Sequence, residues 1–345
     1  MPGDDGGTTP ADRMRIDAAD EEHLYANLMR SMADDWEAGG PTRQICRGWE
    51  DAPETALVQL RLLAGVFRIV LSGRAPELVP FYRCLGGQAP PDEAWPAVRH
   101  VLERHTFELH GALAVAPQTN EVGRSTALLV GLFEAVRRTG LTRIRLLEPG
   151  ASAGLNLLVD QFLFVNQNWR FGPRGSPLVL SDGVRGDVEP TDFEVVARRG
   201  CDLAPVDADD AHGQLRLRSF VWPFHPDRHE RLDAALKIAQ RLPVTVDQGA
   251  AGEWLEERLS EPVDGDVLTV VWQSITRLYW PAEEIRRVDA AVRRAASAGP
   301  VAHIAMEFPS EGPSAEAELT LTLPETAMEI LATVGDHGTP VRVGD

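Results

Sequence analysis

The sequence predicts an α/β protein in which a helical N-terminal region precedes a mostly parallel β-sheet. Apolar residues recur with a helical period through residues 16–138. From residue 142 onward, short β-rich runs alternate with helical patterns, which is typical of parallel strands joined by helices. The last runs, at residues 317–323, 326–334 and 340–343, follow one another without helical patterns between them. They predict an antiparallel hairpin at the edge of the sheet.

The same patterns divide the chain into regions. Residues 1–15 read as a disordered acidic leader, because they contain few apolar residues and several Gly and Asp. Residues 16–140 form the predicted helical region. Residues 141–345 form the predicted α/β domain, and an Asp- and Gly-rich stretch predicts an insertion near residues 165–192.

Individual elements follow from the spacing of apolar residues and from the residues that start or stop a helix. Val58, Leu62, Val66 and Ile69 share one face of a predicted helix. A later helix is expected to begin near Asn120, as an N-cap, and to stop at a glycine, residue 140. Strands are predicted at residues 144–147, 193–197, 244–246, 266–272 and 301–306, with helices at 155–159, 229–241, 252–259 and 281–296.

Composition excludes several classes of function. The 345 residues include 34 basic and 52 acidic ones, and the formal charge of -18 argues against a broad nucleic-acid footprint, which needs clustered Lys and Arg. No apolar run approaches the length of a membrane span. No G-K-[ST] string is present for a P-loop. Three widely spaced cysteines form no C-x-x-C pair, which favours a reducing cytoplasm.

The most informative string is LEPGASAGLN, residues 147–156, at a predicted turn from strand to helix. Open α/β sheets bind ligands at such turns. As G-x-S-x-G the string matches a nucleophile elbow, with Ser152 as the nucleophile and His337 as a histidine in the correct chain order. However, a hydrolase of that fold needs several strands before the elbow, and here the preceding residues have helical periodicity.

Two further interpretations of the string use no nucleophile. A dinucleotide fingerprint requires glycine at two positions that hold Ser152 and Leu155, and no basic residue lies nearby for a pyrophosphate. The string could also be a tight turn that binds nothing.

As E-x-G-x-S-x-G, the string resembles motif I of class I S-adenosylmethionine-dependent methyltransferases. An acidic residue ends the first strand there, and small residues let the backbone approach the ligand. The ammonium and sulfonium of that ligand would be attracted by a carboxylate. Serine at position 152 departs from the usual glycine. The cofactor-binding residues that this resemblance implies within the string are Glu148, Gly150, Ala151, Ser152, Gly154 and Asn156.

A wider resemblance covers most of the chain after the leader. Four strings occur in order: PQTNEVGR at residues 117–124, LLEPGASAGLNLL at 146–158, GCDLAPVD at 200–207, and VWP at 221–223 followed by Arg228. Together they resemble a bacterial family of uncharacterised proteins, domain of unknown function 2332. The resemblance implies a methyltransferase-like Rossmann fold with a mostly parallel sheet, and it implies no substrate.

Two more acidic residues are candidates for cofactor binding because they follow predicted strands. Asp202 would hold the ribose hydroxyls of the cofactor, or alternatively cap a turn. Asp247 would contact the adenine, or alternatively cap the next helix. The chain between Gly154 and Asp202 is longer than one helix requires, which agrees with the predicted insertion.

Residues on the acceptor side of the site are expected in two places. Gln273, Ser274 and Tyr279 follow the strand at residues 266–272. A polar group that opens the helix before the motif could fold over the mouth of the site or simply cap and pair within the helix: Asn120, Glu121 and Arg124.

The sequence therefore predicts binding of S-adenosylmethionine and methyl transfer to an unknown small-molecule or protein acceptor. It identifies no catalytic base, and histidine spacing predicts no metal site. Two alternatives remain open: a serine hydrolase that uses Ser152 and His337, and a noncatalytic Rossmann-like module that binds a ligand.

Overall fold

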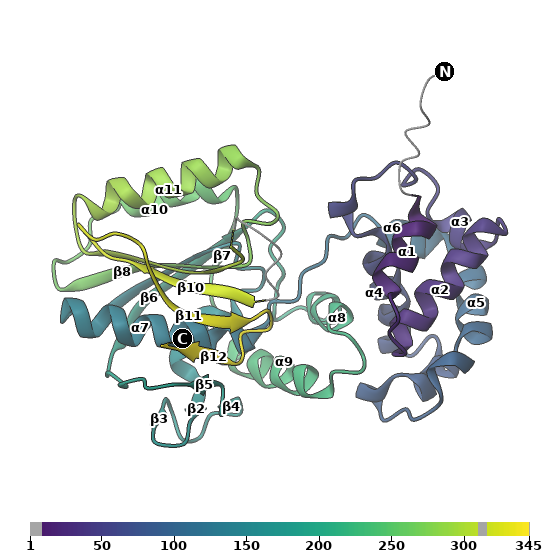
Figure 1. Cartoon of the computed structure of the whole chain (residues 1–345), viewed down its shortest axis with the longest axis horizontal. Coiled ribbons are helices and arrows are strands. Elements are labelled where there is room, and N and C mark those ends of the chain that lie inside the picture. The colour runs from purple at the N-terminus through teal and green to yellow at the C-terminus, as the bar shows by residue number, and fades with distance from the viewer. Residues whose placement is uncertain (1–8, 310–315, 345) are drawn as a thin grey trace. The chain divides into compact units, whose positions relative to one another are not determined.

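The computed structural model describes residues 9–309 and 316–344, which form two compact units (Figure 1). The first unit comprises Met1–Thr119 and Leu215–His229, and the second comprises Asn120–Gln214 and Glu230–Asp345. Within the described residues, no helix combines the length and the apolar character needed to cross a membrane.

The first unit is helical, as the apolar periodicity predicts. On α4 (Val58–Leu71) the predicted stripe of Val58, Leu62, Val66 and Ile69 is at most 4% exposed. Around it lie α1 (Pro10–Ala18), α2 (Leu24–Glu37), α3 (Pro41–Ile45), α5 (Trp95–Arg104), α6 (Thr106–Ala112) and the 3-10 turns η1 (Glu54–Ala56), η2 (Pro76–Phe81), η3 (Arg83–Leu85) and η4 (Pro91–Glu93).

The prediction of a disordered leader over residues 1–15 is wrong from Pro10 onward, and residues 1–8 lie outside the described residues. Thr9 caps α1: its hydroxyl accepts from the Asp12 N–H at 3.2 Å, and the Asp12 carboxylate accepts from the Thr9 N–H at 3.0 Å. Met14 is buried in the core of the unit. Ala11 and Ala18 are buried beside it, and these apolar contacts together with the cap order a segment whose composition alone favours disorder.

The second unit contains a nine-stranded sheet and a smaller three-stranded one. The order of the large sheet is β5-β12-β11-β10-β9-β8-β1-β6-β7, and that of the small sheet is β3-β2-β4. The strands are β1 (Arg143–Pro149), β2 (Leu163–Val165), β3 (Arg170–Phe171), β4 (Val179–Ser181), β5 (Val184–Arg185), β6 (Glu194–Asp202), β7 (Val246–Gln248), β8 (Val267–Ser274), β9 (Val301–Glu307), β10 (Glu316–Thr322), β11 (Glu329–Gly335) and β12 (Val341–Val343).

Five neighbouring strands of the large sheet, β7-β6-β1-β8-β9, are all parallel. Numbered by their order along the chain, these five strands lie side by side as 3-2-1-4-5. The chain therefore adds β6 and β7 on one side of β1 and then returns to add β8 and β9 on the other side. This places a topological switch point between β1 and β8, where open α/β sheets bind ligands. The strands β10, β11 and β12 continue the sheet as an antiparallel meander beside β9, as predicted. The edge itself differs from the prediction, because β5 pairs in parallel with β12 outside this meander.

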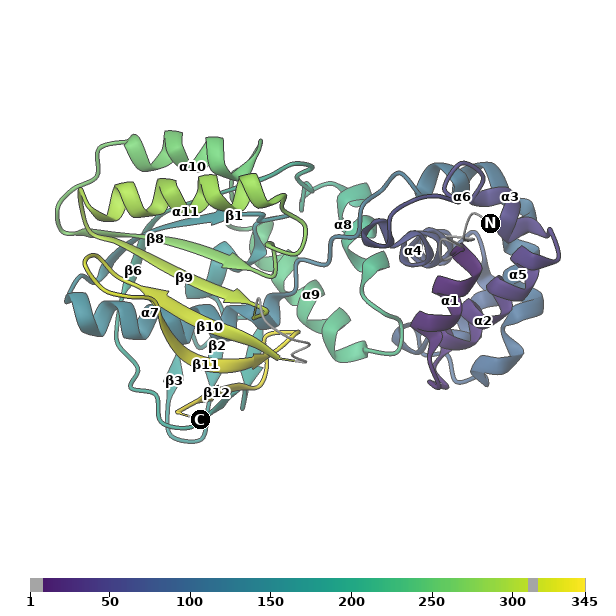
Figure 2. The same ribbon diagram turned by 45° about the horizontal axis from the view of Figure 1, so that its top comes forward.

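Helices cover both faces of this sheet: α10 (Ala251–Ser260) and α11 (Ala282–Ala296) lie on one, and α7 (Ser125–Thr139) lies on the other (Figures 1 and 2). On the first face, Leu147 of β1 and Val271 of β8 pack with α10 and α11. Successive side chains of a strand point to opposite faces. The next residues, Glu148 and Trp272, therefore point to the face that α7 covers.

The predicted boundary between residues 140 and 141 is displaced to Thr119/Asn120, because α7 packs against β9 and β10 of the sheet. Two further helices, α8 (Ala211–Phe220) and α9 (Pro226–Ala239), contain residues of both units. The 3-10 turn η5 (Val122–Arg124) precedes α7. The sequence predicts Asn120 as the N-cap here, but the N-cap of η5 is Glu121.

The segment after β1 differs from the predicted helix. It is a 3-10 segment, η6 (Leu155–Gln161), with non-helical backbone at Leu158. Arg198 of β6 donates to the Leu157 carbonyl at 2.9 Å, an acceptor that a continuing α-helix would use, and pairs with Asp160. The chain then forms β2 to β5, which occupy the position of the predicted insertion.

Candidate functional site

Acidic side chains gather at the carboxyl ends of the parallel strands. Glu148 is the penultimate residue of β1, Asp202 ends β6 and Glu307 ends β9. In the β1–β6 register, Glu148 lies opposite Gly200, so Asp202 lies just beyond it along the sheet. The negative charge of Asp202 disfavours ionisation of Glu148 and so helps to raise the pKa of that carboxyl. We call this end of the sheet, with Glu148 and Asp202 beside the switch point, the acidic crevice.

Glu148 is the most deeply buried acid in this crevice. Its side chain belongs to a residue that is 3% exposed, and its Oε2 makes no hydrogen bond with any described residue. Burial raises the pKa of this carboxyl to about 8, against weaker opposing effects of Asn156 and Arg124. Glu148 is thus mostly protonated at neutral pH until a cation pairs with it.

Two other buried polar atoms near Glu148 lack a hydrogen-bond partner among the described residues. They are the indole Nε1 of Trp272, whose N–H is directed at the Glu148 carboxyl and lowers its pKa, and the Oγ of Ser152 in the loop after β1. Native structures leave few such atoms unsatisfied, because each costs free energy. The Trp272 N–H can donate a hydrogen bond, Glu148 Oε2 can accept one, and the Ser152 hydroxyl can do either. Three such groups close together indicate a site at which a polar ligand would supply the missing partners.

The raised pKa of Glu148 gives a test on stability. A carboxyl whose pKa is about 8 when folded contributes stability that is fully present below its ordinary pKa near 4.5 and is lost as pH rises through 8. Between these values the slope is about 1.4 kcal/mol per pH unit for this group. In urea unfolding at pH 5.5, 6.5 and 7.5, the Glu148→Gln variant should gain stability over the wild-type protein at each step. Parallel curves for the two proteins would contradict the buried, neutral carboxyl.

The loop after β1, residues 150–155, has every backbone N–H engaged within the protein. Gly150 and Ala151 both donate to the Cys201 carbonyl, at 2.8 and 2.9 Å, and Gly154 donates to the Ala151 carbonyl at 2.7 Å. These three bonds fix the loop against the end of β6.

Side chains accept from the remaining N–H groups of this loop. The Asp202 carboxylate accepts from Ser152 at 2.9 Å, and the Asn120 side-chain oxygen accepts from both Ala153 and Leu155 at 3.1 Å. A loop that binds a pyrophosphate presents its N–H groups to the ligand. This loop has none to present, which argues against the dinucleotide interpretation.

The same bonds bear on Ser152 as a nucleophile. Ser152 has a left-handed backbone, with φ of 55°, at the turn after a strand, as a nucleophile elbow requires. However, the N–H of Ala153, which would have to stabilise an oxyanion, is bonded to Asn120. No hydrogen bond joins the Ser152 hydroxyl to His337 or to another described residue. The geometry lacks both the activated serine and the oxyanion hole.

Arg124 and Asn156 complete the surroundings of Glu148. The charge of Arg124 lowers the pKa of Glu148, and the guanidinium donates to the backbone carbonyls of Ser274, at 3.0 Å, and Asp336, at 3.3 Å. Asn156 is buried, and its oxygen accepts from the Ser125 hydroxyl at 2.7 Å, which fixes its orientation beside Glu148. The guanidinium of Arg124 therefore places a positive charge close to the Glu148 carboxyl.

The two glycines of the motif, Gly150 and Gly154, allow a close approach to their backbone, but the groups that approach them are other residues of the protein. Gly150 has φ of 78°, and a Cβ there would lie 2.5 Å from Thr276 Cγ2. Gly154 has φ of 72°, and a Cβ there would lie 2.8 Å from Val244. Both positions require glycine for backbone conformation and for space. Ala151 is fully buried, and its methyl group packs toward Gly200.

Several predicted site residues lie outside this cluster. Asp247 forms a bidentate pair with Arg199, at 2.7 and 2.8 Å, and accepts from the Trp254 indole at 2.6 Å, so its carboxylate braces β6 and α10. Tyr279 is 62% exposed. The Glu121 carboxylate accepts from the Gly123 N–H at 3.0 Å, and its Oε1 lies 3.7 Å from a guanidinium nitrogen of Arg231.

Gln273 and Ser274 stand at the end of β8, as predicted, and reveal a residue that sequence reasoning missed. The Gln273 side chain is fully buried and donates to Glu307 at 3.1 Å. Glu307 also accepts from the N–H and hydroxyl of Thr276 and from the N–H of Arg277, and burial raises its pKa. Glu307 thereby holds the loop after β8 in place. Its position at the end of an apolar strand, like that of Glu148, was the signal available in the sequence.

No group of three His, Cys, Asp or Glu side chains in residues 9–309 and 316–344 is arranged to hold a metal ion. Cys46, Cys84 and Cys201 form no disulfide with one another.

The fold and the crevice define an α/β protein with a large, mostly parallel mixed sheet and an acidic site at its switch point. The chain belongs to the family described as "Uncharacterized protein conserved in bacteria (DUF2332)", whose profile matches residues 11–342. No curated protein and no solved structure matches the chain.

Proposed function

We propose that the second unit binds S-adenosylmethionine in the crevice at the ends of β1, β6 and β8 and transfers its methyl group to an acceptor. The observation that carries this proposal is the buried carboxyl of Glu148, whose Oε2 makes no hydrogen bond with a described residue, beside a loop that has no N–H group available for an anion. Such a site attracts a cation and repels a phosphate.

The groups around Glu148 match the amino-acid end of that ligand. Its ammonium pairs with Glu148, and its carboxylate lies toward the Arg124 guanidinium and the unpartnered Trp272 N–H. The Asp202 carboxylate, at the end of the neighbouring strand, accepts from the ribose hydroxyls in addition to its bond with the loop. The unsatisfied Oε2 of Glu148 and Nε1 of Trp272 thus both gain partners.

The strand order supports the methyltransferase-like Rossmann fold, since five parallel strands in doubly wound order are followed by antiparallel strands at one edge. The absence of a disulfide among the three cysteines supports action in the cytoplasm. The acceptor, a small molecule or a protein, approaches the sulfonium from the side of the loop that follows β8.

Thermal unfolding distinguishes this function from the alternatives. S-adenosylmethionine or S-adenosylhomocysteine at 100 times its Kd stabilises the folded protein by about 2.7 kcal/mol, which raises the Tm of a chain of this length by about 4 °C. NAD⁺ should give no shift, and a fluorophosphonate probe should leave Ser152 unlabelled. Absence of a shift with both adenosyl ligands refutes the proposal, and labelling of Ser152 favours a hydrolase. A shift without methyl transfer to any acceptor leaves a ligand-binding module.

Binding should also release a proton, because Glu148 is protonated in the ligand-free protein and ionised beside an ammonium. Titrations at pH 7 in buffers with different ionisation enthalpies should report release of about one proton per ligand bound. The Glu148→Gln variant, examined at higher ligand concentration, should release none. Equal proton release by the two proteins would assign the proton to another group.

A further inference from the structure

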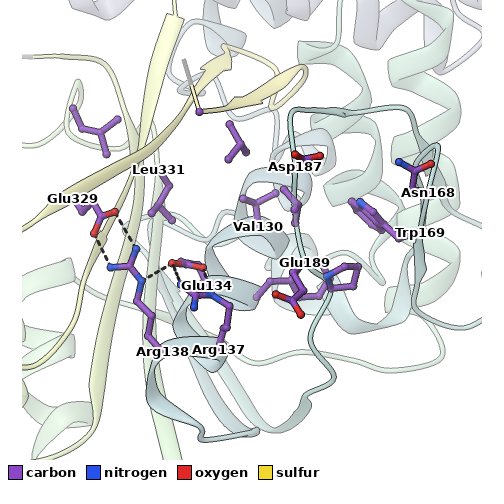
Figure 3. A pocket seen from close by; sticks show the side chains of 16 residues that line it. Val130, Glu134, Arg137, Arg138, Asn168, Trp169, Asp187, Glu189, Glu329 and Leu331 are labelled. Atoms are coloured by element: carbon purple, nitrogen blue, oxygen red, sulfur yellow. Dashed lines mark hydrogen bonds and ion pairs between the residues drawn. The ribbon is translucent and has the colours of Figure 1, made fainter.

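A second cavity lies in the α/β unit among α7, residues 168–190, β11 and the end of β12 (Figure 3). Its volume is about 790 Å³, within the range of sites that bind small molecules. It shares no lining residue with the crevice around Glu148. A ligand here is therefore independent of the proposed function.

The floor of the cavity is apolar and rigid. Val130 and Phe133 of α7 and Leu331 of β11 form part of it. Leu331 is the extra residue where the β10–β11 register shifts, and such a bulge redirects a side chain from the regular alternation. The Trp169 ring packs edge-to-face on Phe133, with centroids 5.9 Å apart and an interplanar angle of 81°. This contact holds the indole in the cavity wall.

On one wall, the arginines are already neutralised. Arg138 bridges Glu329, at 2.6 and 2.9 Å, and Glu134, while Arg137 pairs with Glu134 at 2.6 and 2.8 Å (Figure 3). The two guanidinium groups hold the pKa of Glu134 at about 2. This wall is a closed network without net charge, so it offers little attraction to an anion.

The opposite wall carries negative charge beside the indole. Asp187 lies near Asn168 and Trp169, and Glu189 lies below them (Figure 3). Among the described residues, the carboxylates of Asp187 and Glu189 make no hydrogen bond or ion pair of 4.0 Å or less, and Glu189 interacts with the charge of Arg137 only at longer range. Two arginines against four carboxylates leave the lining with an excess of two negative charges.

We propose that this cavity binds a small organic cation, an ammonium or guanidinium group carried on an apolar body. The body lies on the apolar floor, and the cation lies between the Trp169 indole and the carboxylates of Asp187 and Glu189. An indole is the side chain that best attracts a cation over its face. A neutral or anionic ligand of the same shape would gain no electrostatic attraction from the indole and the two carboxylates.

Matched probes test this assignment on the full chain. Calorimetric or ligand-observed NMR titrations at low ionic strength compare 2-phenylethylamine with neutral 2-phenylethanol and anionic 3-phenylpropionate. The amine should bind at least about 10-fold more tightly than the alcohol, and the acid should bind most weakly. Equal affinity of amine and alcohol, or no detectable binding of the amine, would overturn the proposal.

Variants then locate the bound amine. The double variant Asp187→Asn/Glu189→Gln changes two exposed side chains and should remove the preference for the amine, whereas Asp192→Asn, an exposed acid of the same segment outside the lining, should retain it. Trp169→Leu should weaken the binding of 2-phenylethylamine several-fold. A preference that survives the double variant, or that disappears in Glu148→Gln, would place the amine elsewhere. Failure of S-adenosylmethionine to bind has no bearing on these results.

Discussion

Replacement of Glu148 with glutamine is expected to weaken the binding of S-adenosylmethionine by about 100-fold, or about 2.7 kcal/mol. Only a carboxylate can ionise to pair with the ligand's ammonium in a site from which water is excluded, and charge-assisted hydrogen bonds of this kind are the strong ones. Calorimetric titration measures the loss directly. Glutamine keeps the shape of the side chain, so the effect reports the charge.

A matched control for this variant lies at the opposite end of the same sheet. Glu194 begins β6, is exposed, and stands beside the start of β1, whereas Asp202 ends β6 beside the crevice. Glu194→Gln removes the same charge from the unit and should leave affinity within about two-fold. If Glu194→Gln and Glu148→Gln weaken binding equally, the affinity depends on the net charge of the protein and not on the position of Glu148 in the crevice.

The second large effect is expected at Asn120, where one side-chain oxygen accepts from the N–H groups of Ala153 and Leu155. Asn120→Ala leaves both groups without this acceptor, and a lost partner of a buried donor costs about 1–3 kcal/mol. The free energy of unfolding should fall by about 2–4 kcal/mol, and ligand binding should fall with it. Urea unfolding and the calorimetric titration measure the two effects.

Two further substitutions separate the hydrogen bonds from the backbone conformation, because Asn120 has φ of 39°, which disfavours alanine. Asn120→Gly accepts this φ but lacks the oxygen, so it should lose most of the stability that Asn120→Ala loses. Asn120→Asp keeps the acceptor and should retain most of the stability. A glycine variant as stable as the wild-type protein would show that the bonds to the loop contribute nothing.

The architecture could be predicted because its signals are local. Apolar runs ending in an acid located β1 and Glu148, and alternation of strand and helix patterns predicted the parallel sheet. The antiparallel strands β10 to β12 followed from the absence of helical patterns between the runs at residues 317–343, whereas the position of β5 outside β12 had no local signal. These features depend on neighbours in sequence, which is what periodicity measures.

The state of the loop could not be predicted because its partners are remote in sequence. Asn120 precedes the N–H group of Ala153 by 33 positions, and Asp202 follows that of Ser152 by 50. A helix cap was the local interpretation of Asn120, and tertiary packing replaced it with a bond to another loop. Only the pairing of β1 with β6 brings Asp202 to Ser152.

The same reason explains Asp247 and the segment after Gly154. The sequence places Asp247 just after a strand, as a ligand-binding acid would be, but Asp247 lies within β7, where β6 places Arg199 beside it and α10 adds Trp254. Helical periodicity at residues 155–159 was too short to exclude a 3-10 turn, which η6 adopts before the inserted strands. Both outcomes depend on which elements become neighbours in space.

The central claim is that the acidic crevice selects a cationic adenosyl ligand, and one titration tests it most directly. Calorimetry of the full chain with S-adenosylmethionine at pH 7.5 should give one site with a Kd of the order of micromolar, corresponding to about -8 kcal/mol. The Glu148→Gln variant should bind about 100-fold more weakly in the same buffer. No binding heat from the wild-type protein at millimolar ligand would contradict the claim.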